Sequence, residues 1–225
     1  MQRSTVHLVR HGEVYNPEGV LYGRLPEFHL SELGQRMARQ VAGYFEQRQE
    51  DGARIVHLVA SPLVRAQETA RPIAAALGLG LATDERVIEA ENRFEGMSKI
   101  KSRLRQPRYW PLLVNPFRPS WGEPYHEQVE RVMAAMDDAR RRALELAGPT
   151  EDGRPAEAII VSHQLPIWVT RLAAERRRLW HDPRQRECTL TSVTSFDFDG
   201  GTVQRVRYVE PSAHLLPGAA NVPGA

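Results

Sequence analysis

The chain has 225 residues, 41% of them hydrophobic and 26% charged, with a formal net charge of +2. That length is enough for one buried core, the charge is too small to indicate nucleic-acid binding by itself, and no stretch reaches the roughly 18 to 20 apolar residues of a membrane-spanning helix. Cys188 is the only cysteine, which excludes an intrachain disulfide and a cysteine-based zinc site. Because the N-terminus also enters a strand pattern without a long apolar leader, we expect a cytoplasmic protein outside the membrane.

Strand and helix patterns alternate along the first half of the chain. Short apolar runs predict strands, and the segments that follow them carry apolar residues at helical spacing. Ser31 is expected to cap the first helix, and Gly78 to close the second. The elements expected are, in order, strand 4–9, helix 30–47, strand 54–61, helix 62–78, and a short strand with a loop over 80–90.

The second half opens with a segment of different composition, residues 97–122, which is rich in prolines, aromatic residues and basic residues. We expect it to form a lid-like insertion over one face of the domain. Its basic cluster, "SKIKSRLRQPR" at 98–108, is either a solvated helix face or a cationic cover over an anionic substrate. The elements expected after it are helix 123–148, strand 157–162, helix 165–180, and a hairpin of strands 191–198 and 202–210 turning at 199–201.

Near-continuous apolar strands that alternate with helices predict a three-layer α/β/α sandwich with a mostly parallel central sheet. We expect one domain over residues 1–210. Residues 211–225 are rich in Ala, Pro and Gly, which predicts a flexible C-terminal tail. In sheets of this kind, ligands bind at the carboxyl ends of the strands.

Cations and imidazoles follow three of the expected strands. Arg10 and His11 come directly after the first strand, Arg65 lies one turn into the helix that follows the second, and His163 follows the strand "IIVS". Because these loops converge on one edge of the sheet, they predict a pocket for a tetrahedral dianion. An arginine fork donates two parallel hydrogen bonds to phosphate, and Gly12 lets the backbone approach closely.

Four motifs carry a resemblance to a known family. They are "LVRHGE" at 8–13, "SPLVRAQETA" at 61–70, "VIEAENRFEG" at 87–96 and "VSH" at 161–163. In this order they resemble the histidine phosphatase superfamily, which includes the cofactor-dependent phosphoglycerate mutases. The similarity runs from about residue 4 to residue 200, and the resemblance implies a phosphoglycerate mutase-like fold.

The resemblance implies a phosphohistidine mechanism. His11 would attack phosphorus, while Arg10, Arg65 and His163 would hold the phosphoryl oxygens. Glu89 would protonate the leaving oxygen and then activate water. The family pattern also implies that Asn16 adds a neutral donor to the phosphate. No metal or other cofactor is required, because the cationic side chains offset the phosphoryl charge.

The chain departs from the family pattern in two places. Between Glu89 and the preserved ending "FEG", the usual glycine is replaced by "EN", so Glu91 remains a second candidate for the acid. After His163 the family has glycine, whereas this chain has Gln164, which is either a further donor to phosphate or the first residue of a helix. Glu123, at the start of the long helix, is either a substrate contact or an acid favoured by the helix dipole.

The leading hypothesis is a histidine acid-type phosphatase that hydrolyses small phosphomonoesters. The departure at 87–96 favours hydrolysis over the alternative of a phosphoglycerate mutase-type transferase. A catalytically inactive phospho-ligand binding module would need neither the nucleophile nor the acid. The basic cluster at 98–108 also raises the hypothesis of nucleic-acid binding, which salt-dependent affinity would test, but we expect no nucleic-acid partner. The sequence carries no signal for the oligomeric state.

His7 and His11 have the spacing of a helical zinc pair, but His7 lies in the first expected strand and His11 follows its end, so the segment is extended rather than helical. Four residues of a strand span roughly 13 Å, so the two side chains are expected to lie too far apart to share a metal.

Overall fold

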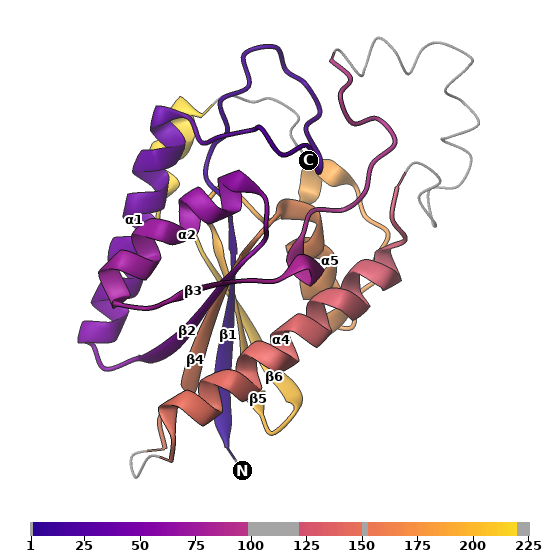
Figure 1. The fold of residues 1–225 in the computed structure, drawn as a ribbon. Coiled ribbons are helices and arrows are strands. Elements are labelled where there is room, and N and C mark those ends of the chain that lie inside the picture. The colour runs from indigo at the N-terminus through magenta and orange to yellow at the C-terminus, as the bar shows by residue number, and fades with distance from the viewer. Residues whose placement is uncertain (1, 99–121, 150–152, 220–225) are drawn as a thin grey trace.

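A six-stranded sheet forms the centre of the computed structural model, which describes residues 2–98, 122–149 and 153–219 (Figure 1). The strand order is β3-β2-β4-β1-β5-β6. Strands β1 to β4 are parallel to one another, and β5 is antiparallel to both of its neighbours, β1 and β6. The strands are β1 Arg3–Arg10, β2 Arg54–Ala60, β3 Leu81–Thr83, β4 Ala156–Ser162, β5 Val193–Asp199 and β6 Thr202–Val209.

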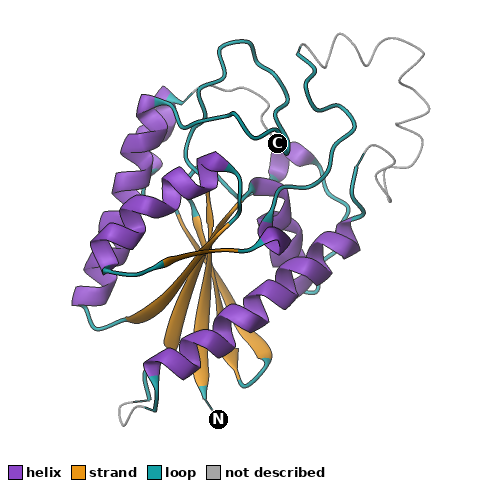
Figure 2. Ribbon diagram, viewed as in Figure 1, coloured by secondary structure: helices purple, strands orange, loops and turns teal. Residues whose placement is uncertain are grey.

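Helices cover both faces of the sheet (Figure 2). On one face, α1 (Glu32–Glu50) and α2 (Val64–Leu77) pack on each other. On the other face lie α4 (Tyr125–Ala147) and α5 (Gln164–Ala174). The mixed α/β fold with a mostly parallel central sheet, predicted as a three-layer sandwich, is therefore confirmed.

The alternation of side chains in β4 explains why two cores form. Ala158 and Ile160 belong to a core with residues of α4 and α5, whereas Ile159 and Val161 belong to a core with residues of α1 and α2. Successive side chains of a strand point to opposite faces, so a strand covered on both faces must be apolar throughout. The uninterrupted apolar run "AIIV" at 158–161 of β4 meets this requirement.

The helix ends follow local signals in most cases. Ser31 caps α1 by accepting a hydrogen bond from the Gly34 N–H at 2.9 Å. Gly78 ends α2 in the left-handed region with φ 65°, where a glycine is not strained. The hairpin turn at 199–201 is also present, with Gly200 at φ 60°.

The helix expected over 165–180 is shorter than predicted. It ends at Ala174, and Arg176 then adopts a left-handed φ of 56°. The Arg177 N–H donates back to the Leu172 carbonyl at 2.8 Å, and the Arg177 guanidinium lies 5.7 Å from the centre of the Trp168 ring. The chain therefore folds back over its own helix, a tertiary contact that the charged stretch "ERRR" does not reveal.

Two other expectations concern the insertion at 97–122 and the C-terminal tail at 211–225. The lid-like insertion expected at 97–122 lies almost entirely outside the described residues. After Pro211, where a flexible tail was expected, the structure has a short 3-10 helix, Ala213–Gly218, and the Ser212 hydroxyl donates to the Met37 carbonyl of α1 at 3.3 Å. Within the ranges given above, no helix is both long and apolar enough to cross a membrane.

Candidate active site

Strand register brings the predicted loops together at the carboxyl edge of the sheet. Arg10 pairs with Ser162, and Ala60 pairs with Val161, so the residues that follow these strands lie side by side. The His11 N–H donates to the Ser162 carbonyl at 3.1 Å. As a result, the rings of His11 and His163 have centroids 5.2 Å apart.

His11 is fully buried, and its two ring nitrogens have different surroundings. Nδ1 lies 2.7 Å from the Gly12 carbonyl oxygen, which can only accept, so Nδ1 carries the hydrogen. Nε2 then holds the free lone pair, and it has no hydrogen-bond partner among the described residues. Burial lowers the pKa of His11 well below its ordinary value, and Arg65 and Arg10 lower it further. The ring is therefore neutral at ordinary pH.

His163 is also fully buried beside it. Its Nε2 lies 2.8 Å from the Ser61 hydroxyl oxygen, while Nδ1 has no partner in the described part of the chain. Burial lowers the pKa of His163 well below its ordinary value, and Arg65 is the next largest cause. Ser61 follows β2 directly, so the residue after one strand orients the histidine after another.

Two arginines reach the same place from different elements. Arg65, in α2, is fully buried and donates to the carbonyls of Gly23 and Leu25, the latter at 3.3 Å, while its guanidinium lies 4.7 Å from the centre of the Tyr22 ring. Arg10 donates to the Cys188 carbonyl at 2.7 Å. These partners are neutral, so both cations keep their charge available. The Nε of each has no partner within the described ranges.

Glu89 completes the cluster. The side chain is buried, with Oε1 accepting from the Ala90 N–H at 2.8 Å and Oε2 without a partner in the residues described. Burial raises its pKa, although Ala90 N–H, Arg65 and Arg186 act in the opposite direction. Glu91, by contrast, is exposed. Of the two acids that the sequence left open, Glu89 is the buried one, and the charges of Arg65 and Arg10 act on it.

A third cation, Arg186, was not predicted. It lies in the loop between α5 and β5, where its Nε donates to His181 Nε2 at 2.9 Å and its Nη1 donates to Gln164 Oε1 at 3.3 Å. Its charge acts on Glu89. Arg186 does not follow a predicted strand end, so the rule that led to Arg10 and His163 does not select it. The surrounding segment is rich in arginine, and no sequence pattern distinguishes Arg186 from its neighbours.

Comparison with known proteins decides the family. A family model described as "Histidine phosphatase superfamily (branch 1)" matches residues 6–211. The chain belongs to the histidine phosphatase superfamily. It is 48% identical to the uncharacterized protein Rv0525 of Mycobacterium tuberculosis (strain ATCC 25618 / H37Rv) over 214 residues, which covers 94% of this chain and 98% of that relative.

Relatives with assigned names lie further away. This chain is 35% identical over 167 residues to a probable phosphoglycerate mutase, GpmB, of Enterobacter sp. (strain 638), covering 72% of this chain and 70% of the relative. Among solved structures, the mycobacterial glucosyl-3-phosphoglycerate phosphatase Rv2419c matches with a TM-score of 0.70 and 22% identity, covering 92% of this chain and 97% of that one. The structural match supports the fold.

Two residues predicted to contact phosphate have side-chain amides that already form hydrogen bonds within the chain. The Asn16 amide closes a local loop, donating to the Val20 carbonyl at 2.8 Å and accepting from the Val20 N–H at 3.0 Å. Gln164 is the first residue of α5, and it donates to the Cys188 carbonyl at 3.3 Å while accepting from Arg186. Gln164 follows His163 directly in the chain, and in both Asn16 and Gln164 the side-chain amide is already engaged.

Glu123 is neutralised by two cations. Its carboxylate accepts from Arg24 at 3.0 Å and from Arg131 at 2.7 Å and 2.9 Å. Arg131 also donates to the carbonyls of Arg86 and Ile88, and Arg24 to the carbonyl of Glu89. The structure thus uses Glu123 to hold the segment that carries Glu89, and neither reading from the sequence described this network.

Gly12 has a steric reason to be glycine. A Cβ there would lie 2.7 Å from the Gly34 carbonyl oxygen in α1, closer than real Cβ contacts come. Its N–H donates to the Thr69 hydroxyl in α2 at 3.0 Å. The loop that carries His11 is therefore fixed against both helices of one face.

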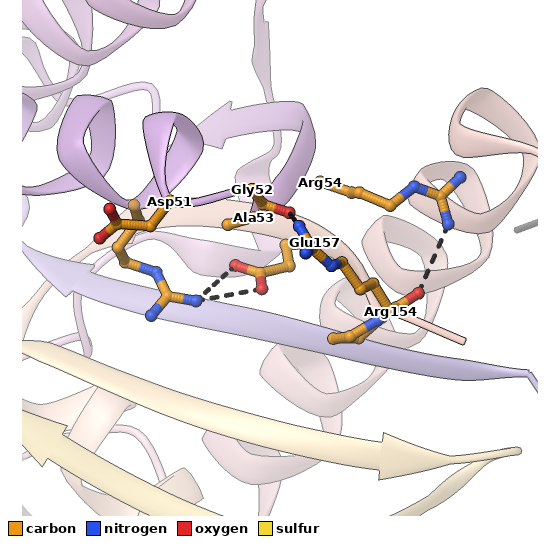
Figure 3. Close-up of a pocket in the computed structure, with 8 residues that line it drawn as sticks. Asp51, Gly52, Ala53, Arg54, Arg154 and Glu157 are labelled. Carbon is orange, nitrogen blue, oxygen red and sulfur yellow. Dashed lines mark hydrogen bonds and ion pairs between the residues drawn. The ribbon is translucent and has the colours of Figure 1, made fainter. Parts of the chain in front are cut away.

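A second charged pocket lies at the opposite edge of the sheet, at the amino ends of β2 and β4 (Figure 3). Arg48 donates to both oxygens of Glu157 at 3.0 Å, and Arg154 donates to the Gly52 carbonyl at 2.8 Å. Arg48 is neutralised by Glu157, and among the described residues this pocket has one buried donor without a partner, Arg48 Nε, against five unpartnered buried atoms in the cluster around His11. The carboxyl edge is the candidate active site.

Proposed function

We propose that this histidine phosphatase is a phosphomonoester hydrolase that works through a phosphohistidine on Nε2 of His11. The observation that carries the proposal is a set of buried polar atoms on one cluster that have no partner among the described residues: His11 Nε2, His163 Nδ1, Glu89 Oε2 and the Nε atoms of Arg10 and Arg65. Buried polar atoms are nearly always paired in native proteins, so a cluster of unpaired ones suits a ligand. Its charge and geometry match a phosphoryl group.

In the first step, the lone pair of His11 Nε2 forms a bond to phosphorus as the ester P–O bond breaks. The leaving oxygen takes the proton of the neutral Glu89 carboxyl group. The raised pKa of Glu89 favours the protonated form that this step requires. Arg10, Arg65 and His163 donate to the phosphoryl oxygens and offset their charge.

In the second step, water replaces His11 on phosphorus. The Glu89 carboxylate takes a proton from the water, whose oxygen bonds to phosphorus as the P–N bond breaks. Inorganic phosphate leaves, and the carboxyl group is again protonated. The lowered pKa of His11 favours its release as a neutral ring, ready for another attack.

A phosphoryl transferase of the mutase type is the second candidate, favoured by the relative named as a probable phosphoglycerate mutase. The two reactions share the first step and differ in what accepts the phosphoryl group. The altered spacing "EAENRFEG" at 87–96 favours water as the acceptor. For the location of the reaction we propose the cytoplasm, since the only cysteine is a buried thiol that suits a reducing compartment.

The proposal is tested with a panel of phosphomonoesters and the variants His11→Ala and His214→Ala. His214 is an exposed histidine of the 3-10 helix and serves as the matched control. We expect the wild type and His214→Ala to release inorganic phosphate and to form an acid-labile, base-stable phosphoryl label. His11→Ala should form no label and lose phosphate release by at least about a thousandfold.

Other outcomes separate the alternatives. Isomerised ester without inorganic phosphate would identify a mutase. Tight binding of phosphate esters with no label and no release in the wild type would identify a binding module. Equal labelling of His11→Ala and wild type would remove His11 from the nucleophilic role.

A further inference from the structure

Arg186 lies at the rim of the active-site cluster and, like Arg10 and Arg65, has only neutral hydrogen-bond partners in the described part of the chain. Its hydrogen-bond partners in the structure are His181 Nε2 and Gln164 Oε1, both neutral groups, and no ion pair joins it to a carboxylate among the described residues. Nearby arginines differ in this respect. Arg184 is paired with Asp182 at 2.6 Å, and Arg171 with Glu175 and Glu187, both at 2.9 Å.

Hydrogen bonds connect Arg186 to the phosphate-binding arginine. Gln164 accepts from Arg186 and donates to the Cys188 carbonyl at 3.3 Å, and that same carbonyl accepts from Arg10 at 2.7 Å. One side chain, that of Gln164, and one backbone carbonyl, that of Cys188, therefore separate the two guanidinium groups. Arg186 is also among the cations that act on Glu89, which places it on the side of the cluster where the proposed acid meets the leaving group.

Aromatic side chains hold the other partner of Arg186. The His181 ring lies with its centroid 5.6 Å from that of Tyr125, at the start of α4, and 6.0 Å from that of Trp168, in α5. His181 Nδ1 lies 2.7 Å from the Leu179 carbonyl oxygen, so Nδ1 carries the hydrogen and Nε2 is free to accept from Arg186. Both partners thus orient the guanidinium without taking up its charge.

We propose that Arg186, oriented by Gln164 and His181, binds a second anionic group on the leaving-group part of the substrate. This inference rests on the proposed function and narrows its substrate class to phosphomonoesters that carry a further anion. A carboxylate and a second phosphate offer the same chemistry to a guanidinium, which donates in pairs to either. Gln164, in the position where the family pattern has glycine, then serves the leaving group through Arg186.

The test compares substrates that differ only in the second anion. 3-Phosphoglycerate and glycerol 3-phosphate share a three-carbon skeleton, and only the first has a carboxylate. Fructose 1,6-bisphosphate and fructose 6-phosphate form the corresponding pair for phosphate. We expect Arg186→Gln to lower the ratio of kcat/KM between the doubly and singly anionic member of at least one pair about 10- to 100-fold. The pair that responds identifies the anion.

Two control variants show whether a change in the kcat/KM ratio is specific to Arg186. Arg184→Gln, which removes a neighbouring arginine already paired with Asp182, should leave both ratios unchanged, and Arg186→Lys should restore part of the loss. An equal loss for both members of each pair would reduce Arg186 to a positioning residue and overturn the proposal. Unchanged rates in Arg186→Gln would overturn it as well.

Binding separates this proposal from the proposed hydrolase activity. If the wild type releases phosphate from none of the four esters, the hydrolase fails, and the subsite is then measured by calorimetry on the unreactive His11→Ala protein. There Arg186→Gln should weaken the doubly anionic ester about tenfold or more relative to the singly anionic one. An unchanged ratio of affinities would overturn the subsite independently of catalysis.

Discussion

Glu89 is the residue at which the two halves of the proposed reaction meet. Burial raises its pKa, so the acid form persists to higher pH than for an ordinary glutamate, and activity should fall as pH rises through that raised pKa. We expect Glu89→Gln to lower kcat on alkyl phosphates about 10²- to 10⁴-fold and to remove this basic limb of the pH profile. The loss should be smaller on p-nitrophenyl phosphate, whose leaving group needs little protonation.

Glu91→Gln is the matched control, because Glu91 lies two residues away and is exposed. Its pH profile should coincide with that of the wild type on both kinds of ester. If instead Glu91→Gln loses the basic limb while Glu89→Gln keeps it, the acid is Glu91 and the burial of Glu89 is structural. Equal loss on alkyl and aryl esters in Glu89→Gln would remove proton donation from its role.

The close crossing of the His11 loop and helix α1 is the feature that matters at the level of elements. A Cβ on Gly34 would lie 2.0 Å from the Glu13 carbonyl oxygen, a backbone atom that no side-chain rotation can move away. We expect Gly34→Ala to destabilise the protein by about 1–3 kcal/mol and to lower kcat/KM, because the shifted loop carries His11. Urea denaturation and phosphatase kinetics measure the two effects.

Gly43→Ala, in the same helix, is the control, since a Cβ there meets nothing within 4 Å. Alanine in an open helical position should stabilise by about 0.5–1 kcal/mol and leave kcat/KM unchanged. Were Gly34→Ala to behave like Gly43→Ala, the crossing would have no role in holding the nucleophile.

Elements defined by their own sequence were predicted, and those defined by distant contacts were not. The buried strands are recognisable in the sequence as apolar runs. Because β1 and β4 are parallel, Arg10, His11 and His163 then lie at the same carboxyl edge of the sheet. The early end of α5 depends on Arg177 folding over Trp168, which no local pattern encodes. Arg186 is likewise positioned by hydrogen bonds to Gln164 and His181. The Asn16 amide forms its hydrogen bonds with the backbone of Val20.

Across the whole molecule, the sheet separates two charged clusters that share strand β1. His11 follows its carboxyl end, whereas His7, within the strand, lies 2.8 Å from a Glu157 oxygen through Nε2 and 2.8 Å from the Ser195 hydroxyl through Nδ1. Glu157 accepts in turn from Arg48. Since a carboxylate only accepts, Nε2 carries the hydrogen and neutral His7 satisfies both partners.

This arrangement makes the stability of the fold depend on pH. Burial lowers the pKa of His7, so below about pH 6.5 the unfolded chain binds a proton that folded His7 does not, and the free energy of unfolding falls by about 1.4 kcal/mol per pH unit for that proton. His11 and His163 act with the same sign, and Glu89 with the opposite sign. We expect His7→Gln to flatten the slope in the acid range that begins near pH 6.5, because the substituted side chain no longer takes up a proton on unfolding. Urea denaturation at several pH values measures the slopes, and an unaltered slope in His7→Gln would mean that folded His7 takes up its proton as readily as the unfolded chain.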